Sequence, residues 1–179
     1  MRIRTAAFSG LLAAAAVTVV ASPASAAGAT ITPTEYGKIK LGSTISQMHS
    51  TAGSGACKKY SESRYGGHTY KSYQCKGSKT YSVAQFDFDN GKAYTKAQAG
   101  LIVSNGKMTK AKYDKLKKGD SVATMHRKAG SGVCVRTAES KIAGHTGYAY
   151  QCDQASTHGS AWVTFADGKL NTKSQSHLR

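Results

Sequence analysis

The stretch Ala52-Gly53-Ser54-Gly55-Ala56-Cys57 decides the fold, because the chain contains it twice. Seventy-seven residues later the same positions read Ala129-Gly130-Ser131-Gly132-Val133-Cys134, and the offset is unchanged from the first matched pair, Thr32 and Thr109, onward. Chance does not produce a constant offset over such a length, and no insertion or deletion separates the copies. The sequence therefore predicts a tandem duplication of one unit of roughly 70 residues.

Residues 1–26 have the features of a secretory signal peptide. Arg2 and Arg4 form a basic start, residues 11–21 form a short apolar run, and Ala24-Ser25-Ala26 fits the small-residue cleavage pattern. The apolar run is too short for a transmembrane helix, which needs about 20 residues. We expect an exported mature chain without a membrane span.

The four cysteines occupy equivalent positions, two in each unit. An even, patterned set of cysteines in an exported protein predicts disulfide bonds. Three pairings are possible, and the duplication favours one bridge inside each unit, Cys57–Cys75 and Cys134–Cys152, each worth about 3 kcal/mol in the chain-entropy model. A zinc site is the alternative, but the cysteine spacing and the oxidising compartment disfavour it. We expect no metal ion and no cofactor.

The chain is strongly basic. Removing the two signal-peptide arginines from the 25 Lys and Arg leaves 23 against nine Asp and Glu, a formal net charge of +14. Such a field attracts polyanions and acidic proteins, and it also keeps an exported protein soluble. Lysine greatly outnumbers arginine, whereas base and phosphate recognition relies on arginine, so specific nucleic-acid binding is disfavoured.

Each unit is predicted to begin with two short helices. Thr32 is a suitable N-cap, Pro33 suits the first helical position, and Glu35 completes a capping box. Gly42 is predicted to end this first helix. The pattern indicates a helix of about two turns before a glycine turn.

The second helix of each unit is predicted to begin after Ser43, or after Asp120 in the second copy, because both residue types are good N-caps. It is predicted to end at Gly53, or at Gly130 in the second copy. The twice-quoted stretch is therefore a helix end followed by a disulfide cysteine.

Strands are predicted to follow the helices. Residues 68–76 and 81–88 have side chains that alternate between two faces. Asp89-Asn90-Gly91 is a hairpin signal that makes residues 92–99 the returning strand, and the stretch from Cys57 to Gly67 can supply one more strand at its start. The pattern predicts about four antiparallel strands per unit, with one apolar face against the helices.

The predicted fold class is α+β, with tandem units at residues 27–103 and 104–179. Residues 104–107 are too few for a flexible linker, so both sheets are expected to form one continuous surface. Strand alternation places Trp162, the equivalent of Gln85, on the helix-free face, where an exposed tryptophan is typical of a protein-binding anchor.

No catalytic constellation is evident. Gly53-Ser54-Gly55 lacks a base and an acid nearby, and the duplicated histidine pairs, His49 with His126 and His68 with His145, fit structural roles better than metal ligation. The sequence therefore predicts a protein that is not an enzyme.

Three regions carry a resemblance to a known family. They are the helix pair at residues 36–53 and its copy at 113–130, the strand at 92–101, and the last hairpin at 159–178. Together with the signal and one disulfide per unit, they resemble the β-lactamase inhibitor protein family of actinomycetes, over essentially the whole mature chain.

The resemblance implies a concave sheet that binds a loop–helix region of a class A β-lactamase, with two loops blocking the active site. In the family the first loop carries an Asp that imitates the substrate carboxylate, and the second carries a Phe. Here Lys79 stands nearest the Asp, and Ser156 or Thr157 stands in place of the Phe. A lysine would be repelled by a cationic pocket, so we expect weak inhibition or none.

The predicted function is a secreted, non-enzymatic module that binds a class A β-lactamase or a related penicillin-binding-type enzyme. The alternative is a cationic cell-envelope protein that binds anionic wall polymers. The predicted partner-binding residues are Tyr60, Tyr70, Gln74, Lys79, Tyr81, Gln85, Ser156, Thr157, Trp162 and Thr164.

Overall fold

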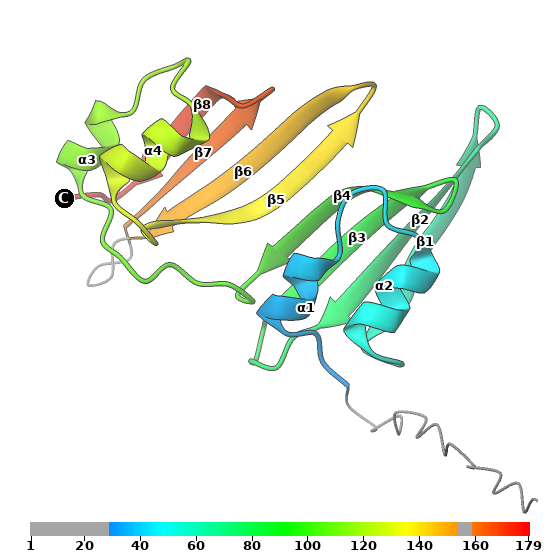
Figure 1. Ribbon diagram of the computed structural model, residues 1–179. Coiled ribbons are helices and arrows are strands. Elements are labelled where there is room, and N and C mark those ends of the chain that lie inside the picture. The colour runs from blue at the N-terminus through cyan, green and yellow to red at the C-terminus, as the bar shows by residue number, and fades with distance from the viewer. Residues whose placement is uncertain (1–28, 154–158) are drawn as a thin grey trace, which may run out of the picture.

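The computed structural model describes residues 29–153 and 159–179, and the predicted signal peptide lies outside this part (Figure 1). Two helices and four strands occur in the same order twice. The elements are α1 (Pro33–Lys38), α2 (Ile45–Ala52), β1 (Cys57–Tyr65), β2 (His68–Lys76), β3 (Val83–Asp89), β4 (Lys92–Ala99), α3 (Lys110–Lys115), α4 (Val122–Ala129), β5 (Cys134–Ile142), β6 (His145–Asp153), β7 (Ser160–Ala166) and β8 (Lys169–Ser176).

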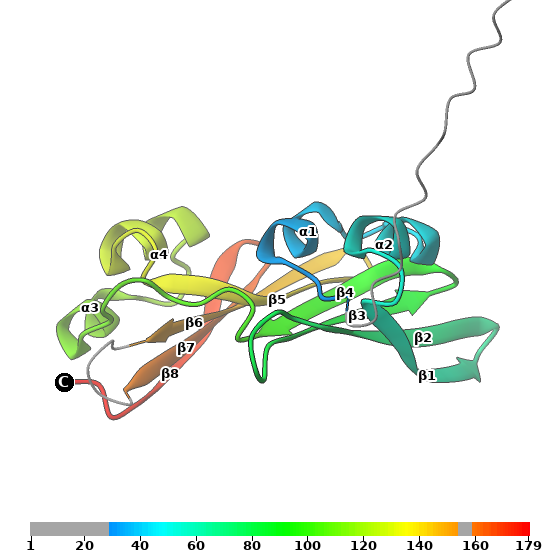
Figure 2. The same cartoon turned by 90° about the horizontal axis from the view of Figure 1, so that it is seen from below.

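All eight strands form one antiparallel sheet in the order β1-β2-β3-β4-β5-β6-β7-β8. The pairing of β4 with β5 joins the two halves, as the prediction of one continuous surface required. Helices α1, α2 and α4 lie on the same side of this sheet (Figure 2). The structure is therefore α+β, with one face of the sheet free of helices.

The N-termini of the helices follow the capping chemistry, with one correction. Thr32 and Glu35 form the predicted capping box. The second helix of each half is capped by Thr44 and Ser121, so the prediction of Ser43 and Asp120 was wrong by one residue. Those two side chains instead accept hydrogen bonds, at 3.1 and 2.8 Å, from backbone N–H groups three residues earlier.

Strands β2 and β4 have the predicted bounds, and β3 begins two residues later than predicted. Tyr81 has a φ of 64°, and the Ser82 N–H bonds to the Lys79 carbonyl at 3.0 Å, so both residues belong to a turn. The hairpin at Asn90-Gly91 is confirmed, with φ of 47° and 77°.

The core consists of two clusters, one in each half, between the helices and the sheet. Met48, Phe86 and Phe88 are fully buried in the first cluster, and Met125 and Val163 occupy the second. The predicted disulfides are confirmed in both halves. Cys57–Cys75 joins the neighbouring strands β1 and β2, and Cys134–Cys152 joins β5 and β6. Within the described residues, the helices are too short to cross a membrane.

Candidate binding face

The helix-free face carries the side chains that alternate with the core along each strand. In the first half, Gln74 lies opposite both Lys58 and Gln85. In the second half, the equivalent row places Trp162 between Gln151 and Ser174. At equivalent positions, the first half therefore carries Gln85 and the second half carries Trp162.

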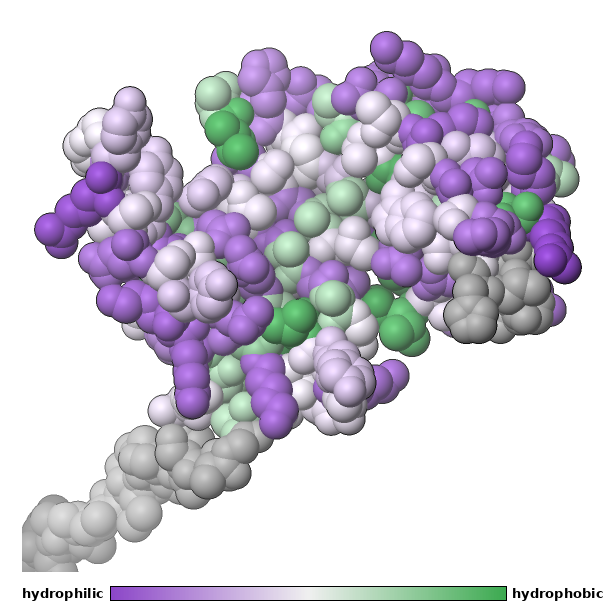
Figure 3. Space-filling model, turned by 180° about the vertical axis from the view of Figure 1, so that it is seen from behind, coloured by the Kyte–Doolittle hydropathy of each residue, from purple (hydrophilic) through white to green (hydrophobic). Residues whose placement is uncertain are grey.

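Small residues separate these two rows at the middle of the sheet. Ala97 of β4 lies opposite Ala138 of β5, which lies opposite Ala149 of β6, and Thr164 continues the line. Figure 3 shows this face as mainly hydrophilic, with weakly apolar residues gathered along its middle. The side chains at the centre of this face are therefore small, and larger side chains lie on either side of them, in each half.

Three predicted aromatic residues are strongly exposed. Tyr81 is 94% exposed, Tyr60 is 75% exposed, and Trp162 is 44% exposed. Large exposed aromatic side chains that no core residue covers are typical of binding surfaces.

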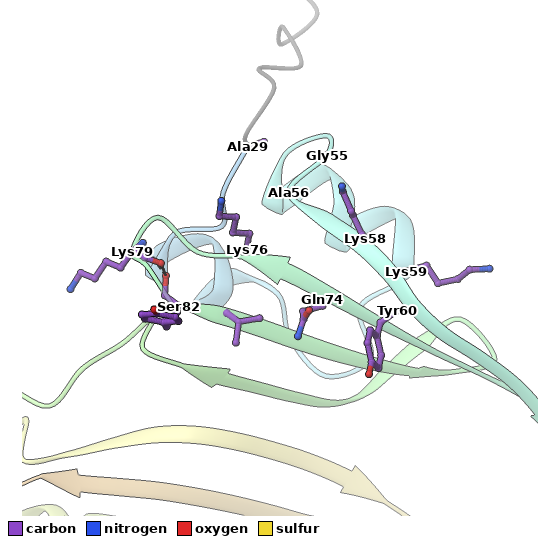
Figure 4. A pocket seen from close by; sticks show the side chains of 12 residues that line it. Ala29, Gly55, Ala56, Lys58, Lys59, Tyr60, Gln74, Lys76, Lys79 and Ser82 are labelled. Atoms are coloured by element: carbon purple, nitrogen blue, oxygen red, sulfur yellow. Dashed lines mark hydrogen bonds between the residues drawn. The ribbon is translucent and has the colours of Figure 1, made fainter. Parts of the chain in front are cut away.

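A hollow of about 740 Å³ opens beside the β2–β3 loop (Figure 4). It brings together four of the predicted residues, Tyr60, Gln74, Lys79 and Tyr81. The complete lining is Ala29, Gly55, Ala56, Lys58, Lys59, Tyr60, Gln74, Lys76, Lys79, Tyr81, Ser82 and Val83. Four lysines and no carboxylate line it, so its rim is cationic.

The β2–β3 loop is held by one buried side chain. The Ser82 hydroxyl, with the residue only 5% exposed, donates to the Lys79 carbonyl at 2.6 Å and accepts from the Lys79 N–H at 3.0 Å. In Figure 4 the Lys79 side chain extends away from the hollow into solvent. A loop that presents an ammonium group without a partner among the described residues would repel a cationic target pocket.

The structure does not bring all predicted site residues together. Tyr70 lies near the β1–β2 hairpin, 5.9 Å from His68 and 6.2 Å from Tyr94 between ring centroids. Thr164 lines a separate hollow at the junction of the halves. Ser156 and Thr157 lie outside the described residues.

Lys58, Lys76 and Ser82 were missed by the sequence reasoning. A signal for the first was present, because a disulfide between Cys57 and Cys75 makes these residues cross-strand partners and places Lys58 opposite Gln74. No sequence signal indicated that Ser82 would close the loop.

On the helix side, the junction is built around a buried lysine. Lys96 is 4% exposed, and its Nζ donates to the carbonyls of Ile39 at 2.8 Å and Tyr36 at 3.3 Å. Burial lowers the pKa of Lys96, while Glu139 opposes this shift. Burial and then Glu139 raise the pKa of Tyr36.

The histidines in the described part of the chain contact other protein groups. His49 packs edge-on against Tyr73, with ring centroids 5.3 Å apart, and His126 makes the same contact in the second half. His68 bonds to Asp89 at 2.8 Å. Among the described residues, no group of three or more His, Cys, Asp and Glu side chains could hold a metal ion.

A family model described as β-lactamase inhibitor (BLIP) matches residues 32–152. The chain belongs to the β-lactamase inhibitor family. Members of this family are inhibitor proteins and not enzymes, so the expectation of a non-enzyme is confirmed. The two short-helix pairs and the eight-stranded sheet of this BLIP-family chain agree with that assignment.

Among solved structures, the BLIP-family chain is similar to a Streptococcus mutans protein named as a proposed β-lactamase inhibitor protein. The TM-score is 0.61 at 21% sequence identity, and the match covers 84% of this chain and 91% of that chain. Identity at this level shows a shared fold alone. No curated protein matches the chain significantly.

Proposed function

We propose that this BLIP-family chain binds a class A β-lactamase or a related penicillin-recognising enzyme through its helix-free face, as a weak inhibitor or none. The observation that carries the proposal is the exposed Trp162 on that face, next to a line of small residues. An exposed tryptophan beside a low surface suits a protruding segment of a partner, because such anchors supply most of the affinity of an interface.

Weak inhibition follows from the charge of the β2–β3 loop. A substrate-like carboxylate is needed where a β-lactamase receives the carboxylate of its substrate, and the loop presents Lys79 instead. Bringing like charges together at an interface costs several kcal/mol. The target therefore binds the sheet without a group that enters its active site favourably.

The chain organisation belongs to the same proposal. Residues 1–26 act as a signal peptide, and residues 27–103 and 104–179 are two copies of one unit. The two disulfides are consistent with secretion into an oxidising compartment. Each unit alone is small, and the β4–β5 pairing lets them share one sheet.

Binding and inhibition measured separately test the proposal. The protein is immobilised and titrated with a panel of class A β-lactamases and penicillin-binding proteins at about 50 and 200 mM salt, and hydrolysis is followed in parallel. Saturable binding with little inhibition is the expected result. Absence of binding across the panel at micromolar protein contradicts the proposal. Binding to anionic wall polymers that falls steeply with salt favours the alternative function.

A further inference from the structure

The eight-stranded sheet has two free edges, β1 and β8. In the described part of the chain, β1 pairs only with β2, and β8 pairs only with β7. Residues of β1 after Cys57 are exposed along the whole strand. An edge strand presents unpaired backbone N–H and C=O groups that can pair with another strand.

The junction between the two halves shows how such edges pair in this protein. Thr95, Lys96 and Ala97 of β4 lie opposite Ser140, Glu139 and Ala138 of β5. Lys96 Nζ is 3.9 Å from Glu139 Oε1. The Gln98 side-chain amide donates to the Arg136 carbonyl at 3.2 Å.

The free edges repeat the chemistry of this junction. An offset of 77 residues relates Lys96 on β4 to Lys173 on β8, and Glu139 on β5 to Glu62 on β1. Lys173 Nζ donates to the Tyr113 carbonyl at 3.0 Å, as Lys96 does in its own half. Lys173 is therefore already held in the position that Lys96 uses.

Glu62, the acidic residue at the free β1 edge, has the same kind of ion pair as its equivalent Glu139. Lys59 pairs with Glu62 at 2.7 Å, and the equivalent Arg136 pairs with Glu139 at 2.8 Å. Both β1 and β5 carry an irregularity at the same place, two residues after their cysteine. Gln175, the equivalent of Gln98, accepts from the Leu178 N–H at 3.1 Å, just as Gln98 accepts from Leu101.

We propose that β8 of one copy pairs antiparallel with β1 of a second copy, using the register of the β4–β5 junction. Lys173 would lie opposite Glu62, with Thr172 opposite Ser63 and Ser174 opposite Ser61. The two surfaces differ, so the contact is head-to-tail and leaves one free β1 and one free β8 for further copies. The helix-free face of each copy stays accessible.

The association is expected to be weak and to become stronger as the salt concentration rises. Three residue pairs form a contact below the size of stable interfaces, so a Kd on the order of 0.1–1 mM is expected. The chain carries a large positive charge, and copies repel one another. Screening this repulsion strengthens the association as salt rises, whereas an attraction dominated by single ion pairs would weaken.

A charge exchange tests the proposal. Sedimentation equilibrium at up to about 1 mM protein is expected to show concentration-dependent dimers for the parent chain. Glu62→Lys and Lys173→Glu each place like charges opposite one another, and each variant alone is expected to associate about tenfold more weakly. An equimolar mixture of the two variants recovers dimers, because one pairing has opposite charges again. A single cooperative thermal transition in each variant shows that it is folded, since loss of the Lys173 hydrogen bond or of the Glu62 ion pairs lowers the melting temperature without preventing folding.

Disulfide trapping tests the register independently of affinity. Under mild oxidation, Ser61→Cys mixed with Ser174→Cys is expected to give a covalent heterodimer several times faster than Ser63→Cys mixed with Ser174→Cys, which is out of register by two residues. Equal trapping in the two mixtures overturns the proposed register. A parent chain that stays monomeric at all salt concentrations, or a charge-exchange mixture without recovery, overturns the association.

Discussion

Lys96 on β4 and Glu139 on β5 are direct cross-strand partners, with Nζ 3.9 Å from Oε1, and both side chains are nearly buried. This pair is one of the polar contacts between the halves, together with the hydrogen bond from the Gln98 amide to the Arg136 carbonyl. Lys96 Nζ also lies 4.6 Å from the centroid of the Tyr36 ring. One side chain therefore links the end of α1, the centre of the sheet and the neighbouring half.

Replacing Lys96 with Met is expected to destabilise the protein. The carbonyls of Tyr36 and Ile39 lose a charged donor, and each such loss of a hydrogen bond to a charged group costs about 1.5–3 kcal/mol. Thermal unfolding followed by circular dichroism measures the change in melting temperature.

Lys173→Met is the matched control for this substitution. Lys173 bonds to the Tyr113 carbonyl at 3.0 Å in the same way, but it lies at a free edge and is only partly buried. Water can replace its donor there, so a cost below about 1 kcal/mol is expected. Equal costs at both positions would show that burial at the junction does not decide the contribution of this lysine.

Trp162→Ala is expected to weaken binding to any target of the helix-free face. A central anchor of an interface contributes about 2 kcal/mol or more, which corresponds to a loss of at least about tenfold in affinity. Tyr65→Ala is the control, because Tyr65 is 83% exposed at the tip of the β1–β2 hairpin, away from the Trp162 row. A target whose affinity is unaffected by Trp162→Ala binds elsewhere on the molecule.

Lys79→Asp is expected to increase inhibition of a class A β-lactamase that binds the sheet. The substitution replaces a repelled ammonium group with a carboxylate at the loop position, and the loop itself stays held by Ser82. Removing like-charge repulsion and adding attraction changes the interaction by several kcal/mol. Lys79→Ala separates the two contributions, with inhibition expected between the parent and the Asp variant. Identical inhibition constants for all three proteins would contradict a role for this position.

Much of the architecture could be predicted because its causes are local. Thr32 and Glu35 cap a helix within four residues, and Asn90-Gly91 supplies the two positive φ angles of a tight hairpin. The N-cap at Thr44 also has a local cause, a capping box with Gln47, which the sequence prediction overlooked in favour of Ser43. The contact that the sequence could not show is distant along the chain, since the Ala93 N–H bonds to the Ser43 carbonyl at 2.9 Å.

The binding face could be predicted only in part. Strand alternation correctly placed Gln85 and Trp162 on the helix-free side, since the side-chain period of a strand is two. The position of Tyr60 depends on a bulge between Lys59 and Ser61, and counting residues cannot detect such a bulge. The hollow that Tyr60 lines also depends on the β2–β3 loop conformation, which the hydrogen bonds between Ser82 and Lys79 hold.

Removing either disulfide is expected to destabilise the chain by a comparable amount. Cys57–Cys75 and Cys134–Cys152 each span 18 residues and join equivalent strands. Loss of a native disulfide in a small secreted domain costs about 2–5 kcal/mol. Paired Cys→Ser variants, one for each bridge, are compared by urea unfolding monitored with fluorescence and circular dichroism. A bridge whose loss leaves the midpoint unchanged would be dispensable for stability.

Acid unfolding is expected to depend on Asp120. The hydrogen-bonded ion pair with Lys128, at 2.7 Å, is the largest cause that lowers the pKa of Asp120. The hydrogen bond from the Lys117 N–H lowers this pKa further. Because the folded pKa lies below the ordinary value of 3.8, the unfolded chain takes up the proton first as pH falls. The stabilisation is complete above this ordinary value and disappears as pH falls through the folded value. The free energy of unfolding of the parent should therefore fall more steeply below about pH 4 than that of Asp120→Asn. Lys128→Met removes the larger cause of the lowered pKa, so its profile of unfolding free energy against pH should lie between those of the parent and Asp120→Asn. Parallel profiles for the parent and Asp120→Asn would contradict a role for Asp120 in acid unfolding.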